Sequence, residues 1–240
     1  MQLLSSALSL LVVLLPSLST SVSAARASTH DLYTSAIPLS PTSYTFSRGN
    51  LASSLKVDLF IDLACSDCMN SWPLLSEVYA SYSSEFKFSY HLFPLPYHQF
   101  AFLLTKSATI VDMYSDDPDA VFRFMDTVYV PANQGLIYNS VTSATSYNEI
   151  QSLVGTWVTN SSNVSLDAYN TAMLSDEDAE MNTRYMWKSV TDRGGVCGTP
   201  TFAVNDVYVN DVETRVQWDE MLEGLMAMAK KMKKSGGEDL

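Results

Sequence analysis

The pattern of apolar and polar positions predicts a strand, a helix and a second strand in the first half of the chain. Residues 57–64 (VDLFIDLA) form a short apolar run, typical of a central strand that is buried on both faces. Residues 68–82 place apolar side chains three and four positions apart, which predicts a helix with one face inward. Residues 86–93 alternate like a second strand, and Pro94 ends it.

The middle of the chain is predicted to be helical. Helical spacing recurs in residues 100–113, 119–128, 147–158 and 166–190. The segment that contains Pro131, Asn133 and Gly135 is interpreted as a connection between helices, because these residue types favour turns.

The strand pattern returns near the end of the chain. Residues 201–204 and 207–209 flank Asn205-Asp206, which predicts a hairpin. Residues 218–234 form a last helix whose final lysines suit the negative end of the helix dipole. The order of elements predicts an α/β fold in which a helical insertion, about residues 99–190, separates a βαβ half from a ββα half.

Residues 1–24 are predicted to be a cleaved signal peptide. Leu3 to Leu15 is apolar and uncharged but short for a membrane span, and Val22-Ser23-Ala24 has the small residues that signal peptidase accepts. An uncleaved anchor helix is the alternative. Residues 25–240 then form a single mature domain without a membrane span, either in the endoplasmic reticulum lumen or outside the cell.

Composition and charge narrow the possible partners. The chain has 14 basic and 26 acidic residues, for a net charge of −12, and such a field repels nucleic acid. Three cysteines in 240 residues are too few for a disulfide-stapled scaffold. Glycosylation sequons begin at Asn160 and Asn163, in a stretch interpreted as a surface loop, and support the secretory route.

The candidate chemistry lies in Cys65-Ser66-Asp67-Cys68, between a predicted strand and a predicted helix. Unpaired N–H groups at the helix start can stabilise an exposed thiolate at Cys65, with Cys68 within bonding distance. A zinc site and an inert structural disulfide are the alternatives. Zinc needs two further ligands, and we predict no metal because the remaining candidates contain no ligand-like pair: Cys197, His30, His91 and His98.

Several motifs together resemble the thioredoxin superfamily, and the long insertion points to its DsbA-like branch. Pro73 lies five residues after the second cysteine, and Gly198-Thr199-Pro200-Thr201-Phe202 precedes the hairpin in the place of the cis-proline loop. The resemblance covers roughly residues 42–230. It also includes Gly49-Asn50, Asp62, Phe93 to His98, and Asn205.

This resemblance implies a thioredoxin-like fold and a protein thiol–disulfide oxidoreductase that uses no cofactor. Cys65 is the expected nucleophile, and Cys68 the buried resolving thiol. Thr199, held by a cis Pro200, is expected to pair with an extended substrate segment. The implied partners are protein or peptide thiols and disulfides, with glutathione or a membrane oxidase as candidate redox partners.

Two other functions fit the same outline. The first is a redox-inactive thioredoxin-like module that binds peptides beside Pro200 while its cysteines form a permanent disulfide. The second is a kappa-like glutathione transferase or isomerase, which does not need a second cysteine at Cys68.

The chain departs from the family pattern at positions expected to tune the chemistry. Ser66 and Asp67 stand where DsbA-like proteins often have Pro followed by His or Tyr, and an anionic Asp67 is expected to disfavour the thiolate and make a weaker oxidant. Leu59 stands where many relatives bury a proton-transferring carboxylate. The candidate substitutes are Asp58, Asp62 and Glu77.

Other chemistry-bearing residues are given structural roles. Cys197, three residues before Pro200, is either a third redox thiol or a small buried residue, and the second interpretation is favoured because free cysteine is commonly buried. His98 is interpreted as a helix-entry residue rather than a base. Four methionines are predicted to lie in the core or on a helix face: Met221, Met226, Met228 and Met232.

Overall fold

The computed structural model describes residues 44–142, 145–192, 195–209 and 211–234, which fall within one compact unit. The predicted signal peptide and His30 lie outside the described residues. The helices and strands are β1 (Phe46–Gly49), β2 (Lys56–Ile61), α2 (Ser66–Tyr82), β3 (Lys87–Leu92), α3 (Ala101–Tyr114), α4 (Ala120–Val128), α5 (Pro131–Thr142), α6 (Tyr147–Ser161), α7 (Leu166–Ser175), α8 (Glu177–Thr191), β4 (Thr201–Val204), β5 (Val207–Tyr208) and α9 (Arg215–Lys234).

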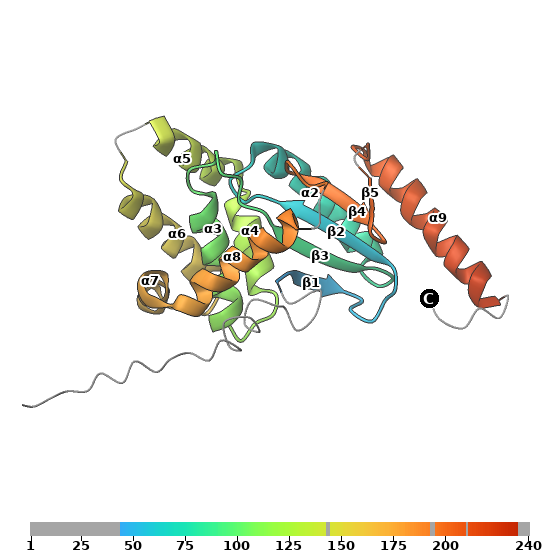
Figure 1. Ribbon diagram of the computed structural model, residues 1–240, viewed down its shortest axis with the longest axis horizontal. Coiled ribbons are helices and arrows are strands. Elements are labelled where there is room, and N and C mark those ends of the chain that lie inside the picture. Colours follow the sequence, from blue (N-terminus) through green and yellow to red (C-terminus); the bar gives the residue numbers. More distant parts are fainter. Residues whose placement is uncertain (1–43, 143–144, 193–194, 210, 235–240) are drawn as a thin grey trace, which may run out of the picture. The chain divides into compact units, whose positions relative to one another are not determined.

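The described strands form a single mixed sheet in the order β1-β3-β2-β4-β5 (Figure 1). Strands β2 and β3 are parallel, and the other neighbouring pairs are antiparallel. The predicted central strand is confirmed, because β2 occupies the middle of the sheet. Its Leu59 and Ile61 side chains join the main core, whereas Phe60 joins a second apolar cluster.

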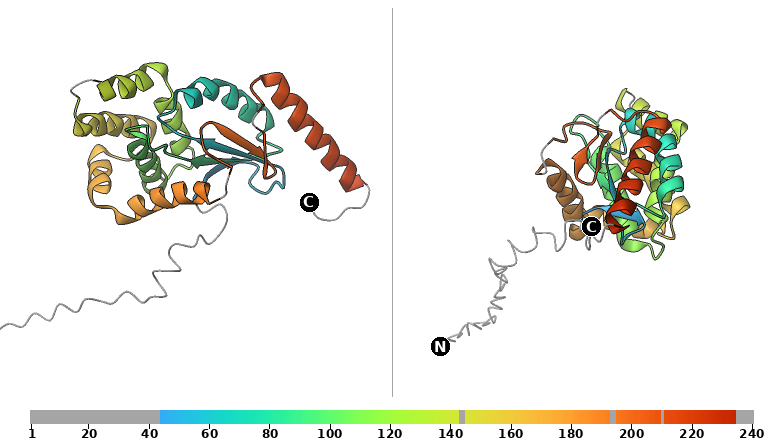
Figure 2. Two further views of the ribbon diagram at one scale, coloured as in Figure 1. Left: turned by 45° about the horizontal axis from the view of Figure 1, so that its top comes forward. Right: turned by 90° about the vertical axis from the view of Figure 1, so that its right-hand side faces the viewer.

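The two apolar clusters correspond to the two faces of the sheet. Helices α2 and α9 contact each other, and Trp218 of α9 packs edge-on against Phe202 of β4, with 5.4 Å between the ring centroids. The second cluster brings Val190, at the end of α8, together with Phe60 and Ala203. Helices α3 to α8 lie together, and α9 lies apart from them next to α2 (Figure 2).

The helical middle of the chain was predicted in outline, but two of its details were wrong. The segment interpreted as a connection is helix α5, which begins at Pro131 because proline suits the first helical position, where its missing N–H would have no partner. The single helix predicted for residues 166–190 is two helices. Asp176 ends α7 and caps α8, accepting a hydrogen bond from Ala179 N–H at 3.0 Å.

The predicted hairpin is confirmed, and its turn is joined to the central strand. Asn205 and Asp206 have φ angles of 46° and 64°, as a two-residue hairpin turn requires. The Asn205 side chain also accepts a hydrogen bond from Lys56 N–H at 2.8 Å, at the start of β2. Strand β1 has only four residues and was not predicted.

Helix α9 begins three residues earlier than predicted, at Arg215. Met221 and Met226 pack against the core, whereas Met228 and Met232 are exposed, so the predicted core or helix-face positions are confirmed. Within the described residues, no helix is both long enough and apolar enough to cross a bilayer.

Candidate redox-active site

Cys65 and Cys68 lie at the start of α2, immediately after the loop that leaves β2. Cys65 is the N-cap residue of the helix, and its side chain makes no capping hydrogen bond. The backbone N–H groups of Cys68 and Asp67 nevertheless lie near enough to the Cys65 sulfur to lower its pKa. The nucleophile candidate therefore occupies the position where a helix start needs an acceptor.

The two thiols differ in acidity. The pKa of Cys65 is lowered to about 6, first because the Cys68 thiol can donate a hydrogen bond to it. Burial raises the pKa of Cys68, and its neighbour Cys65 raises it further. Both cysteines are free thiols with little exposed surface, 5% at Cys65 and none at Cys68. The expectation that Cys65 is exposed was therefore wrong, because the cis-proline loop, which contains Thr199, covers it.

Thr199 contacts this pair from the opposite side. The Cys65 thiol donates a hydrogen bond to the Thr199 carbonyl oxygen, at 3.3 Å between sulfur and oxygen. The Thr199 hydroxyl is buried without a hydrogen-bond partner among the described residues, and its proximity to the two sulfurs lowers the pKa of both cysteines. The Thr199–Pro200 peptide bond is cis, as the sequence predicts.

Ser66 and Asp67, the residues between the cysteines, are both exposed. Asp67 acts on the pKa of Cys65 through its backbone N–H, which lowers it, and its carboxylate is not among the largest influences. Because the pKa of Cys65 is lowered overall, the expected disfavouring of the thiolate by Asp67 is outweighed at this helix start.

Asp62 is buried where the CxxC loop meets the segment that enters α3. One carboxylate oxygen accepts a hydrogen bond from Ala64 N–H at 2.9 Å, and the other accepts from Leu95 N–H at 3.0 Å. His98 Nδ1 lies 2.6 Å from that second oxygen. Burial raises the pKa of Asp62, and these hydrogen bonds oppose the rise. His98, interpreted from the sequence as a helix-entry residue, is thus a partner of Asp62.

The other carboxylates considered for proton transfer lie in different surroundings. Asp58 is buried on β2 and pairs with His91 Nε2 at 2.6 Å. Glu77 is exposed on α2. Asp62 is the one of the three with hydrogen bonds to the CxxC loop, through Ala64.

Three side chains from the inserted helices bind the backbone that precedes Cys65. Tyr129 hydroxyl donates to the Asp62 carbonyl at 3.0 Å, Gln134 Nε2 to the Leu63 carbonyl at 2.6 Å, and Tyr138 hydroxyl to the Ala64 carbonyl at 2.7 Å. These carbonyls are consecutive, and we call the three donors the carbonyl clamp. Sequence reasoning missed the clamp because two of its donors lie on α5, which was interpreted as a connection.

Two clamp residues also lie near the sulfurs. The Tyr129 hydroxyl hydrogen-bonds Cys68, and burial followed by the nearby negative groups raises the pKa of Tyr129. Burial likewise raises the pKa of Tyr138. The Ser66 hydroxyl opposes this rise, and the nearby Cys65 adds to it. The insertion therefore supplies part of the electrostatic surroundings of the CxxC sequence.

The remaining predicted site residues lie on the surface. Cys197 is an exposed free thiol, so its interpretation as a small buried residue was wrong. Asn160 and Asn163 are both exposed, Asn160 in the last turn of α6 and Asn163 in the loop before α7. No group of three or more potential metal ligands occurs among the described residues.

A groove of about 330 Å³ lies beside Pro200. Its walls include Leu74 and Leu75 of α2 and the segment at Val212 and Glu213. The groove therefore lies next to the cis-proline loop, whose Thr199 carbonyl contacts Cys65, and no residue of the CxxC sequence lines it.

Comparisons with known proteins agree with this architecture. The family model described as Thioredoxin matches residues 41–224. No curated protein sequence matches the chain significantly. The solved structure of the thiol-disulfide exchange protein alpha-DsbA2 from Wolbachia pipientis is 18% identical, with a TM-score of 0.58 over 75% of this chain and 87% of that chain.

Two further solved structures have the same fold. BdbD from Bacillus subtilis, in its oxidised form, is 16% identical, with a TM-score of 0.57 over 75% of this chain and 92% of that chain. MdbA, a thiol-disulfide oxidoreductase from Actinomyces oris, is 16% identical, with a TM-score of 0.57 over 75% of this chain and 85% of that chain. The predicted thioredoxin-like fold with its helical insertion is confirmed.

Proposed function

Because this chain belongs to the thioredoxin family, we propose that it is a thiol–disulfide oxidoreductase that exchanges disulfides with protein substrates through Cys65 and Cys68. The observation that carries the proposal is the split acidity of the pair. The pKa of Cys65 is lowered to about 6, whereas that of the buried Cys68 is raised. One thiol is thus a thiolate at neutral pH, and the other is held in reserve.

The exchange proceeds in two steps. The Cys65 thiolate attacks a substrate disulfide, forming a mixed disulfide and releasing one substrate sulfur as a thiolate. Cys68 then attacks Cys65, and its proton passes to the second substrate sulfur as that sulfur leaves. The substrate disulfide gains two electrons, and the Cys65–Cys68 pair loses two. The reverse sequence oxidises a substrate dithiol.

Substrate binding is assigned to the loop that contains Thr199 and Pro200. A free Cys65 thiol donates to the Thr199 carbonyl, but a thiolate or a mixed disulfide has no hydrogen to donate. Ionisation of Cys65 therefore leaves this carbonyl available to accept a backbone N–H from an extended substrate segment. The adjoining groove offers apolar surface from Leu74 and Leu75 for a substrate side chain.

The related structures support the same chemistry. Alpha-DsbA2 is described as a thiol-disulfide exchange protein and MdbA as a thiol-disulfide oxidoreductase. In this chain, the corresponding chemistry requires protein or peptide thiols and disulfides as partners, and glutathione or a membrane oxidase to reset the pair.

Insulin reduction and oxidative refolding of a reduced client test the proposal. Wild-type protein is expected to accelerate both reactions, and the Cys65→Ser variant neither; equal rates for the two proteins would refute the catalytic assignment. A redox titration separates the oxidoreductase from a peptide-binding module with a permanent disulfide, whose midpoint would lie far below the glutathione poise. Glutathione conjugation that survives Cys68→Ala would instead favour a kappa-like transferase.

We place this activity in the secretory pathway. The proposal rests on residues 1–24 as a signal peptide and on the exposure of Asn160 and Asn163. Expression in a secreting eukaryotic cell is expected to yield a product that begins at residue 25 and loses mass on endoglycosidase treatment. An intact N-terminus together with an unchanged mass would contradict this location.

A further inference from the structure

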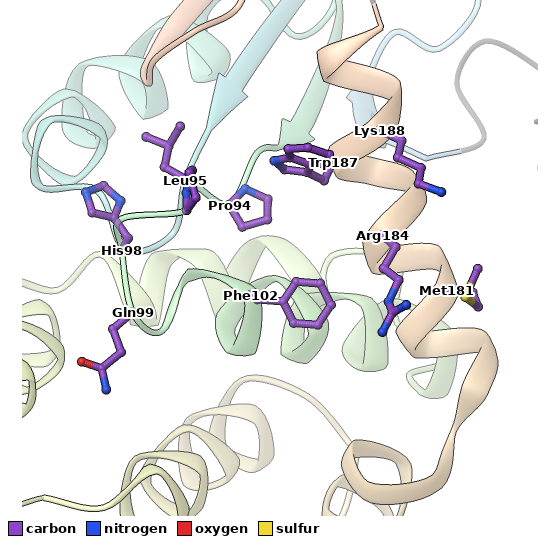
Figure 3. A pocket seen from close by; sticks show the side chains of 10 residues that line it. Pro94, Leu95, His98, Gln99, Phe102, Met181, Arg184, Trp187 and Lys188 are labelled. Carbon is purple, nitrogen blue, oxygen red and sulfur yellow. The ribbon is translucent and has the colours of Figure 1, made fainter.

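A second recess lies on the other side of the Asp62–His98 pair from the CxxC loop. It has a volume of about 410 Å³ and is bounded by α3, α8 and the segment that enters α3 (Figure 3). We call it the α3–α8 pocket. None of the described residues that line it also lines the groove beside Pro200, so the two recesses are separate sites.

Part of the lining of the α3–α8 pocket is aromatic and apolar. Phe102 of α3 and Trp187 of α8 project toward the same space, with Pro94 between them (Figure 3). The buried Phe93 ring stacks on Trp187, with 6.4 Å between centroids and 22° between planes. This stacking holds the indole plane in place, although Trp187 keeps 38% of its surface exposed.

The charge of the pocket is opposite to that of the chain. The chain has a net charge of −12, yet the described residues lining the pocket include Arg184 and Lys188 and no carboxylate. Arg184 binds Glu180 through Nε and Nη2, and its Nη1 donors take no part in that pair. Lys188 lies one helical turn further along α8. A cationic edge beside aromatic walls complements an anion with an apolar body.

We propose that the α3–α8 pocket binds a small aromatic carboxylate. The ring lies between Trp187 and Phe102, and the carboxylate accepts hydrogen bonds from Arg184. The volume lies within the range of small-molecule sites, about 300 to 1,000 Å³. Two of the lining residues, Leu95 and His98, hydrogen-bond Asp62, which also accepts from Ala64 N–H in the CxxC loop.

Calorimetric titration with 2-naphthoate tests this proposal directly. The full chain is expected to bind 2-naphthoate at one site. The neutral 2-naphthalenemethanol is expected to bind about tenfold more weakly, because it lacks the charge-assisted hydrogen bonds. The cationic 2-naphthylmethylamine is expected not to bind. Equal affinity for the three probes, or no binding of 2-naphthoate, would overturn the proposal.

Variants locate the bound probe. Arg184→Gln is expected to weaken 2-naphthoate binding about tenfold and to leave 2-naphthalenemethanol unaffected, since only the anion uses the guanidinium. Trp187→Ala is expected to weaken both probes, and the exposed α9 substitution Lys231→Gln neither. Arg184→Lys retains the charge without the guanidinium fork, so it is expected to give an intermediate affinity. Wild-type affinity in both Arg184→Gln and Trp187→Ala would place the probe elsewhere and refute the assignment.

Discussion

At the scale of single residues, one sulfur serves two roles. Cys65 is the N-cap residue of α2, and its sulfur lies beside the unpaired N–H groups of Asp67 and Cys68, although the side chain makes no capping hydrogen bond. A thiolate suits this position better than a thiol, because the helix N-terminus favours negative charge. The local structure thus stabilises the reactive form of the residue.

The acidity of Cys65 gives the first prediction. In a Cys197→Ser background, which removes the exposed third thiol, the rate of iodoacetamide labelling is expected to rise with pH to a half-maximal value at about 6, the pKa of Cys65. Mass spectrometry of the labelled peptide identifies the residue, and Cys65→Ser serves as the control. A midpoint near 9.0, the ordinary thiol value, would contradict the assignment.

The Thr199 hydroxyl gives the second prediction. Thr199→Val keeps the shape of the side chain but removes a hydroxyl that lowers the pKa of Cys65, so the labelling midpoint of Cys65 is expected to rise. Thr201→Val is the matched control, because that hydroxyl donates to the Gly198 carbonyl at 2.8 Å. An unchanged midpoint, or the same shift in the control, would show that the Thr199 hydroxyl does not specifically lower the pKa of Cys65.

At the scale of elements, the insertion supports the redox loop. The carbonyl clamp donates to three consecutive buried carbonyls, of which the Asp62 carbonyl also accepts from Cys65 N–H at 3.0 Å. Trp72 of α2 extends the connection: its indole N–H donates to Asp126 of α4 at 2.7 Å, and its ring lies 4.9 Å from that of Tyr129. The inserted helices therefore fix the entry to α2 as well as covering it.

Removing one clamp donor tests this support. Gln134→Met fills the same space but leaves the Leu63 carbonyl without its donor, so the free energy of unfolding is expected to fall by about 1 to 3 kcal/mol. Urea unfolding of the reduced protein measures the change, and Gln151→Met on the partly exposed side of α6 is the control. Equal stability of Gln134→Met and wild type would show that the clamp contributes nothing to folding.

The sequence predicted the parts of this site that follow from local rules. A strand, a CxxC sequence and a helix in succession, together with Thr199-Pro200 before a hairpin, place the sulfurs and the loop opposite them. The clamp could not be predicted in the same way, because its bonds join residues about 70 positions apart, as in Gln134 to Leu63. The same limit applies to the exposure of Cys197, which tertiary packing decides.

Two local signals in the insertion mark helix starts that the apolar spacing alone does not predict. Pro131 favours a connection, but proline is also common at the first position of a helix. A break at Asp176 was equally available from the sequence, since Asp is a frequent N-cap residue. At both positions the helix boundary depends on one residue, Pro131 or Asp176, rather than on the apolar spacing around it.

At the scale of the whole molecule, the redox pair lies between two halves of the fold. The inserted helices bind the loop before Cys65. The cis-proline loop, which precedes β4, contacts the Cys65 sulfur. Both contacts act on the same equilibrium, the choice between the dithiol and the disulfide. The protonation state of the dithiol then decides how that equilibrium depends on pH.

This dependence gives a prediction for the midpoint potential of the Cys65–Cys68 pair. Between pH 6 and 9, the reduced protein carries the Cys65 thiolate and the Cys68 thiol, so reduction takes up two electrons and one proton. The midpoint potential is then expected to fall by about 30 mV per pH unit, and below pH 6 by about 60 mV, because two protons are taken up there. Equilibration with glutathione or dithiothreitol at each pH measures the slope. A slope of about 60 mV that persists to pH 8 would mean that Cys65 stays protonated.

The same linkage fixes the sign of the stability change. The folded-state pKa of Cys65 lies below the ordinary value of 9.0, so the thiolate stabilises the reduced fold fully above about pH 9. That contribution is lost as the pH falls through about 6. The reduced protein is therefore expected to gain stability relative to Cys65→Ser as the pH rises from 6 to 9. If the two proteins instead changed in parallel over this range, the thiolate would not be part of the folded helix cap.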